Sequence, residues 1–200
     1  MNGGRLVGAI TLALFALFFG ILALAGTEEY GVRLLTRTTV RAAFLLFLLA
    51  YVASSARRLW PGDATKWLLR NRRYIGISFG IAMALHLDAI LLLNLLLGDS
   101  FTSPITTLLF GGLAYVFIAA MTFTSFDRTA AWLGPQRWKT LHRVGIHYVG
   151  IVFLVQWLGK LAESLLYLPF LLAMLGGFAV RFAARRSRAA ARNAGATAPA

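Results

Sequence analysis

Three histidines are the residues most able to do chemistry, and all three lie in or at the ends of apolar segments. His86 is in the stretch GIAMALHLDAILLLNLLLG, and His142 and His147 share a second apolar segment. A charged side chain at the centre of a membrane costs about 2.5–3.5 kcal/mol on insertion scales, so a compensating interaction is expected. Neutral imidazole is a common metal ligand and a usual axial ligand of haem iron. The histidines therefore indicate a haem or metal site.

The spacing of the histidines limits which of them can share a site. His86 follows Arg73 by 13 residues, which is about 20 Å along a helix. Counted from Lys139, His142 is about 5 Å and His147 about 12 Å along its own helix. These last two lie about 140° apart around that helix, so they cannot easily face one site. Depth alone does not decide which of them pairs with His86.

The elements that position these residues are membrane spans. The chain has 200 residues, of which 59% are hydrophobic, against about 45–50% in soluble domains. A transmembrane helix needs about 20 mostly apolar residues. Six segments meet this requirement, some of them loosely: residues 6–25, 40–55, 74–98, 105–125, 140–159 and 164–180. The predicted fold is an all-α polytopic membrane bundle of six transmembrane helices. Because cysteine is absent, disulfides, Cys-ligated zinc and iron–sulfur clusters are excluded.

The charges predict the orientation of this bundle. The net charge is +13, and sixteen of the 20 lysines and arginines fall on the side that holds both termini. The positive-inside rule places that side, and both termini, in the cytoplasm. The excess of positive charge then serves orientation and contact with membrane lipid, and no nucleic acid partner is expected. Residues 1–187 form the expected transmembrane domain, and residues 188–200 are expected to be a disordered basic tail.

Three stretches resemble a known family, the ferric reductase-like transmembrane domain. They are RRYIGISFGIAMALH (72–86), FTSFDRTAAWLGPQRWKTLHR (123–143) and, more loosely, TRTTVRAAFLLFLLAY (36–51). The resemblance spans roughly residues 36–157, which is most of the chain. The arginine-pair-to-histidine and tryptophan-to-histidine patterns are moderately specific together and weak singly.

The resemblance implies a haem b protein that passes electrons across a bacterial inner (plasma) membrane. His86 and His142 match haem-ligand positions of the family, and Arg72 and Arg73 match its basic pair on the cytoplasmic, flavin-facing side. Val155 stands where the family carries a second histidine in the fifth span. The chain has His147 in that span instead. The expected haem is thus held by His86 with either His142 or His147.

The same resemblance implies partners on both sides of the membrane. Electrons are expected to come from a cytoplasmic flavin reductase or a quinol, which makes FMN and quinone further candidate cofactors. They are expected to leave for a periplasmic acceptor, either a molybdenum-containing reductase subunit or ferric iron. The chain would then be the electron-transfer subunit of a two-component reductase.

Two other classes of function fit the same residues. A small cofactor-free transporter or structural protein could use a polar site at His86, Asp88 and Asn94. In the structural interpretation, Asp88 pairs with Arg41 or Asn94 near the outer side. A haem-binding sensor or assembly factor is the third class. Absorption by bound haem separates the first class from the others, and reduction by a flavin reductase separates electron transfer from sensing.

Overall fold

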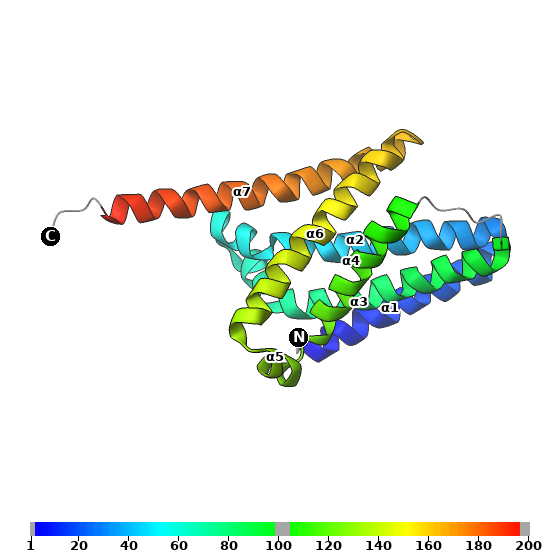
Figure 1. The fold of residues 1–200 in the computed structure, drawn as a ribbon, viewed down its shortest axis with the longest axis horizontal. Helices are drawn as coiled ribbons and strands as arrows, with labels where there is room; N and C mark the ends of the chain where they lie inside the picture. Colours follow the sequence, from blue (N-terminus) through cyan, green and yellow to red (C-terminus); the bar gives the residue numbers. More distant parts are fainter. Residues whose placement is uncertain (1–2, 99–104, 197–200) are drawn as a thin grey trace.

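The computed structural model describes residues 3–98 and 105–196, and in these ranges it contains helices and no strand. The predicted all-α class is therefore confirmed. Figure 1 shows the arrangement of the helices. The elements in chain order are α1 (Gly3–Ala25), α2 (Glu29–Leu59), α3 (Asp63–Leu97), α4 (Ile105–Phe123), α5 (Asp127–Leu133), α6 (Pro135–Leu161), the 3₁₀ turn η2 (Leu165–Tyr167) and α7 (Leu168–Ala196).

The described helices allow five or six membrane spans, where six were predicted. Helices α1, α2, α3 and α6 and the C-terminal stretch Leu165–Ala190 are each long and apolar enough to cross a membrane. A sixth span is obtained when α4 and α5 are counted together, although they are bent by 108°. The chain is thus a multi-pass membrane protein, as predicted.

Helices α2 and α3 begin well before the apolar segments that revealed them. The prediction covered residues 40–55 and 74–98, whereas α2 starts at Glu29 and α3 at Asp63. Charged residues near helix ends can reach the aqueous interface, so an apolar window detects only the middle of a long span. All six basic residues between the second and third apolar segments, expected in a loop, therefore lie in helix α2 or α3.

Helix α1 begins and α7 ends toward the same end of the bundle. In Figure 1 α1 begins in the left-hand half of the bundle, near α5 and on the same side as the α2–α3 turn, and α7 extends past them to the left. The connections from α1 to α2 and from α6 to α7 lie at the opposite end (Figure 1). The prediction requires the first and last helices to end on one side, as they do here. That this side faces the cytoplasm stays a prediction from the positive-inside rule, and we call this end of the bundle the cytoplasmic end in that sense.

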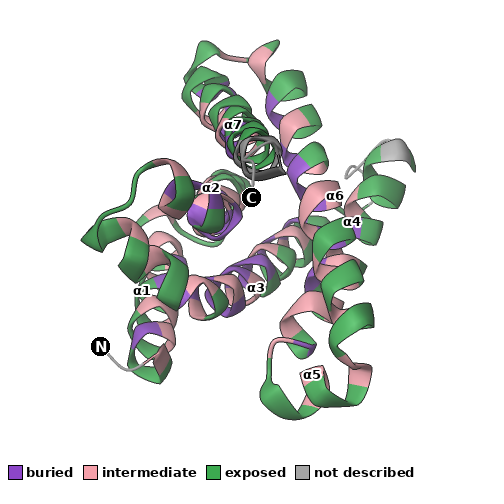
Figure 2. Cartoon of the chain, turned by 90° about the vertical axis from the view of Figure 1, so that its left-hand side faces the viewer, coloured by how far each residue is buried: buried purple, intermediate pink, exposed green. Residues whose placement is uncertain are grey.

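Aromatic side chains from three helices form the centre of the bundle. Phe47 of α2 lies 5.4 Å from Phe79 of α3 and 5.2 Å from Phe153 of α6, measured between ring centroids. Phe44 lies 5.3 Å from the same Phe153 ring. Figure 2, a view from the cytoplasmic end, shows buried residues on the helix faces that look inward. This packing holds α2, α3 and α6 around one interior.

Arg41 has different neighbours from those expected. Its guanidinium lies 5.3 Å from the ring centre of Tyr167 and 5.5 Å from that of Phe170, an arrangement that stabilises a cation by its attraction to aromatic rings.

Asp88 is exposed. Among the described residues neither Arg41 nor Asn94 forms an ion pair or side-chain hydrogen bond with it.

Candidate cofactor site

A partly open cavity of about 630 Å³ lies at the cytoplasmic end and is lined by residues of every described α-helix except α1. Ligand pockets in proteins are commonly about 300–1,000 Å³, so a cofactor-sized molecule can be accommodated. Its walls are formed by Phe47, Ala50, Ser54, Arg72, Arg73, Gly76, Phe79, Ile118, Met121, Thr122, Thr124, Ser125, Asp127, Ala130, Trp138, Lys139, His142, Arg143, Ile146 and Arg181. Three of the five residues predicted for the site, Arg72, Arg73 and His142, are therefore brought together.

His142 lies on the α6 wall of this cavity and is held by two contacts. Its ring stacks on Trp138, with the centroids 4.2 Å apart and the planes at 28°. Its Nε2 is 3.2 Å from the hydroxyl oxygen of Thr124. That hydroxyl lies 2.7 Å from the carbonyl oxygen of Ala120 and donates its proton to it. It therefore accepts a hydrogen bond from Nε2–H of His142. Iron ligation through Nε2 requires the ring to leave Thr124.

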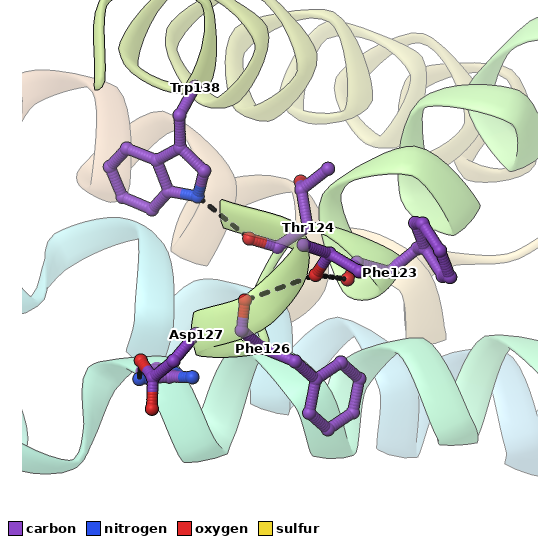
Figure 3. A network of polar contacts seen from close by, with 7 residues as sticks. Phe123, Thr124, Phe126, Asp127 and Trp138 are labelled. Atoms are coloured by element: carbon purple, nitrogen blue, oxygen red, sulfur yellow. Dashed lines mark hydrogen bonds and ion pairs between the residues drawn. The ribbon is translucent and has the colours of Figure 1, made fainter. Parts of the chain in front are cut away.

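The chain reversal between α4 and α6 positions Trp138 and His142. The indole N–H of Trp138 donates to the carbonyl oxygen of Thr124 at 2.9 Å, as Figure 3 shows. Gly134 ends α5 with φ of +79°, a conformation that favours glycine. Pro135 is the first residue of α6, a helix position that suits its fixed φ. Local sequence thus fixes where α6 starts.

Two cavity arginines, Arg72 and Arg181, donate to the backbone of the same helix. The Nε of Arg72 is 3.0 Å from the carbonyl oxygen of Ala50, and Nη1 of Arg181 is 2.8 Å from that of Tyr51. Neither guanidinium has a carboxylate within ion-pair distance in the part of the chain that the structure describes. From the sequence, Arg181 was expected only to contribute to membrane orientation. Its position immediately after the sixth apolar segment was the one sequence feature that could have indicated a place in the site.

Arg73 has a different environment from Arg72. Its Nη1 lies 2.7 Å from a carboxylate oxygen of Asp127, at the start of α5, and the Asp127 side chain is 93% exposed. This ion pair joins α3 to the α4–α5 turn. The two members of the predicted basic pair therefore differ, because Arg73 has a neutralising partner and Arg72 faces the cavity without one.

His86 lies outside the cavity, deeper in the bundle. Its Nδ1 is 3.1 Å from the hydroxyl oxygen of Thr39. That hydroxyl is also 2.9 Å from the carbonyl oxygen of Leu35, which can only accept. Thr39 therefore donates to Leu35 and accepts from Nδ1–H of His86. This tautomer leaves Nε2 of His86 with a free lone pair, and no described residue donates to it.

His147 faces α7 and α2. Its Nε2 accepts a hydrogen bond from Arg185 at 2.8 Å, and its ring lies 6.1 Å from the ring of Tyr51. It does not line the cavity. The prediction that His142 and His147 face different sites agrees with these contacts.

The cavity residues fit the haem expected from the sequence. His142 supplies an imidazole, and Met121 supplies a thioether, the other haem-ligand type on these walls. At Gly76 no neighbouring atom lies within 4 Å of the position that a Cβ would take, so this wall leaves room for a flat ring. The unpaired guanidiniums suit carboxylate groups such as those of haem. In the described ranges no three His, Cys, Asp or Glu residues gather at one place.

The fold and this cavity define a class: a multi-pass helical membrane protein with a basic, imidazole-containing cavity at its cytoplasmic end. The chain is similar to the protein-methionine-sulfoxide reductase heme-binding subunit MsrQ of Ralstonia nicotianae. The two are 27% identical over 183 residues, which cover 84% of this chain and 82% of that protein. No family model and no solved structure matches the chain. This similarity extends over most of the length of both proteins, and the ferric reductase-like family itself stays a prediction.

Proposed function

We propose that this chain is a haem b-binding subunit of the bacterial inner membrane that carries electrons from the cytoplasmic side to a periplasmic acceptor. The observation that carries the proposal is the similarity, over most of both chains, to a haem-binding membrane subunit. The cavity supports it because His142 and the unpaired guanidiniums of Arg72 and Arg181 suit the iron and the acid groups of a haem.

Two histidines are the proposed ligands. Bound haem supplies a one-electron iron couple. His142 lines the cavity, while His86 has a free Nε2 whose orientation is fixed by Thr39. Arg72, Phe79 and His86 are spaced by seven residues and so share one face of α3. That face continues from the cavity wall toward the middle of the bundle. Hydrogen bonds to the second ring nitrogen orient a ligating histidine and raise its basicity, which is the role proposed for Thr39.

The partners follow from the orientation of the bundle. The cytoplasmic end carries most of the basic residues, which favours an electron donor with acidic or phosphate groups. A cytoplasmic flavin reductase acting through reduced FMN fits this condition, and a quinol arriving from the lipid is the second candidate donor. The relative is named as a subunit of a protein-methionine-sulfoxide reductase. The proposed acceptor is therefore a periplasmic, molybdenum-containing reductase of that type, with ferric iron as the alternative acceptor.

Electron transfer across a sealed membrane tests this proposal. The purified protein is reconstituted into vesicles with ferricyanide trapped inside, and a flavin reductase with NADH and FMN is added outside. Loss of internal ferricyanide that requires both the protein and its haem is the expected result. Haem that is reduced without loss of ferricyanide would support the sensor class instead. A colourless protein that leaves ferricyanide unchanged would support the cofactor-free class.

A further inference from the structure

The guanidiniums of Arg72 and Arg181 meet at the backbone of α2. Arg72 comes from α3 and Arg181 from α7, yet their hydrogen-bond acceptors, Ala50 and Tyr51, are consecutive residues. Both side chains line the cavity. Arg181 also lies over the Tyr51 ring, with its Cζ 4.3 Å from the ring centre. These contacts fix the direction of two long side chains that would otherwise be flexible.

Most of the hydrogen-bonding capacity of the two guanidiniums is unused. An arginine side chain carries five N–H donors, and each of these two uses one on a backbone carbonyl. Neither has a carboxylate partner among the described residues. Partly buried charges are normally paired, because an uncompensated charge away from water is costly. Two such cations at one place therefore indicate an anionic ligand.

The cavity around them does not supply that anion. Its walls hold five basic side chains and one carboxylate, that of Asp127. Asp127 is already paired with Arg73 at 2.7 Å. The rest of the wall includes apolar groups such as Phe47 and Phe79. A ligand that satisfies both parts of the cavity is an amphiphile with an apolar body and acid groups at one end.

We propose that Arg72 and Arg181 bind the two propionate carboxylates of the haem that His142 holds at this cavity. This inference rests on the proposed function and adds Arg181, a residue of α7, to the cofactor site. Guanidinium and carboxylate form strong charge-assisted hydrogen bonds. The backbone contacts at Ala50 and Tyr51 preorganise the two donors. Arg73 also lines the cavity but is paired with Asp127, so it is left out of the proposed carboxylate-binding pair.

Binding of haemin and of haemin dimethyl ester to the full-length protein tests the proposal. The protein is produced under haem limitation, purified in detergent and titrated with each compound, and binding is followed by absorbance. Esterification removes the carboxylate charges and leaves the ring and iron unchanged. Wild type should bind the free acid at least roughly tenfold more tightly than the ester. Arg72→Gln and Arg181→Gln should each lose most of that preference by weakening free-acid binding.

Control variants separate this effect from loss of folding. Arg186→Gln changes an exposed arginine of the same helix as Arg181 and should retain the full preference. Arg181→Lys keeps a cation and should restore part of it. Unchanged binding of the dimethyl ester by Arg72→Gln and Arg181→Gln will show that both variants keep the ring site intact.

Each other outcome has a defined meaning. Equal binding of free acid and ester by wild type overturns the carboxylate assignment and leaves the proposed function intact. Absence of binding by both compounds overturns the proposed function itself. Mass spectrometry of the purified protein tests the remaining alternative, a bound lipid. An anionic lipid that is retained by wild type and lost in Arg72→Gln would assign the arginine pair to a lipid headgroup and overturn the inference.

Discussion

Thr39 and His86 are joined across α2 and α3 by a hydrogen bond of 3.1 Å between Oγ1 and Nδ1. Thr39 donates its own proton to the carbonyl of Leu35, so the bond fixes the tautomer of His86 with Nε2 unprotonated. Such an outer hydrogen bond is the usual way in which proteins orient a ligating histidine. The contact joins Thr39, in the loosely matching stretch 36–51, to His86, at the end of the matching stretch 72–86.

Thr39→Val tests this contact, because valine keeps the shape of threonine and removes the hydroxyl. Loss of an outer partner of a metal-ligating histidine commonly costs about 10–100-fold in affinity, and a decrease of this order in haem affinity is expected. The measurement is titration of haem-depleted protein. Thr38→Val is the matched control, since Thr38 bonds only to the carbonyl of Leu34 among the described contacts. Equal affinities for the two variants would contradict the role of Thr39.

His147→Gln is expected to leave the haem spectrum unchanged. The Nε2 of His147 accepts from Arg185 at 2.8 Å, and the side chain does not line the cavity. Glutamine retains an acceptor for Arg185. The absorption spectrum of the reduced protein is the measurement. Conversion of low-spin to high-spin haem in this variant would mean that His147 is an axial ligand.

The sequence predicted the membrane spans well, but it did not predict which side chains meet at the site. Apolar segments and basic residues predicted the spans and the orientation because both depend on composition along the chain. The contacts of the histidines depend on how the helices are rotated against each other, which hydropathy does not specify. Arg181 was missed for the same reason: a basic residue after a span looks the same in sequence whether it faces lipid headgroups or a cavity.

Trp138→Phe is expected to destabilise the protein by about 1 kcal/mol, the usual net contribution of one hydrogen bond. The substitution removes the indole N–H that donates to Thr124 at 2.9 Å. Thermal unfolding in detergent measures the change. The control is Trp132→Phe, because Trp132 is 80% exposed and its replacement should have little effect. A larger loss of stability for Trp132→Phe than for Trp138→Phe would contradict the assigned contact.

Gly80 and Gly76 of α3 should respond differently to alanine. A Cβ at Gly80 would collide with the side chain of Thr122 on α4, whereas a Cβ at Gly76 meets no atom within 4 Å. Overpacking typically costs about 1–3 kcal/mol, so Gly80→Ala should lower the unfolding temperature. In haem-free protein Gly76→Ala should not lower it, since alanine favours the helix more than glycine does. If both variants were equally stable, the close approach of α3 and α4 at Gly80 would be wrong.

Absorption spectra of the purified full-length protein test the central claim most directly. Oxidised and dithionite-reduced spectra are recorded for wild type, His86→Ala and His142→Ala after expression with sufficient haem. We expect a low-spin b-type spectrum for wild type and its loss or conversion to high spin in both variants. Wild-type protein without a Soret band, or spectra that neither substitution alters, would contradict haem ligation by His86 and His142.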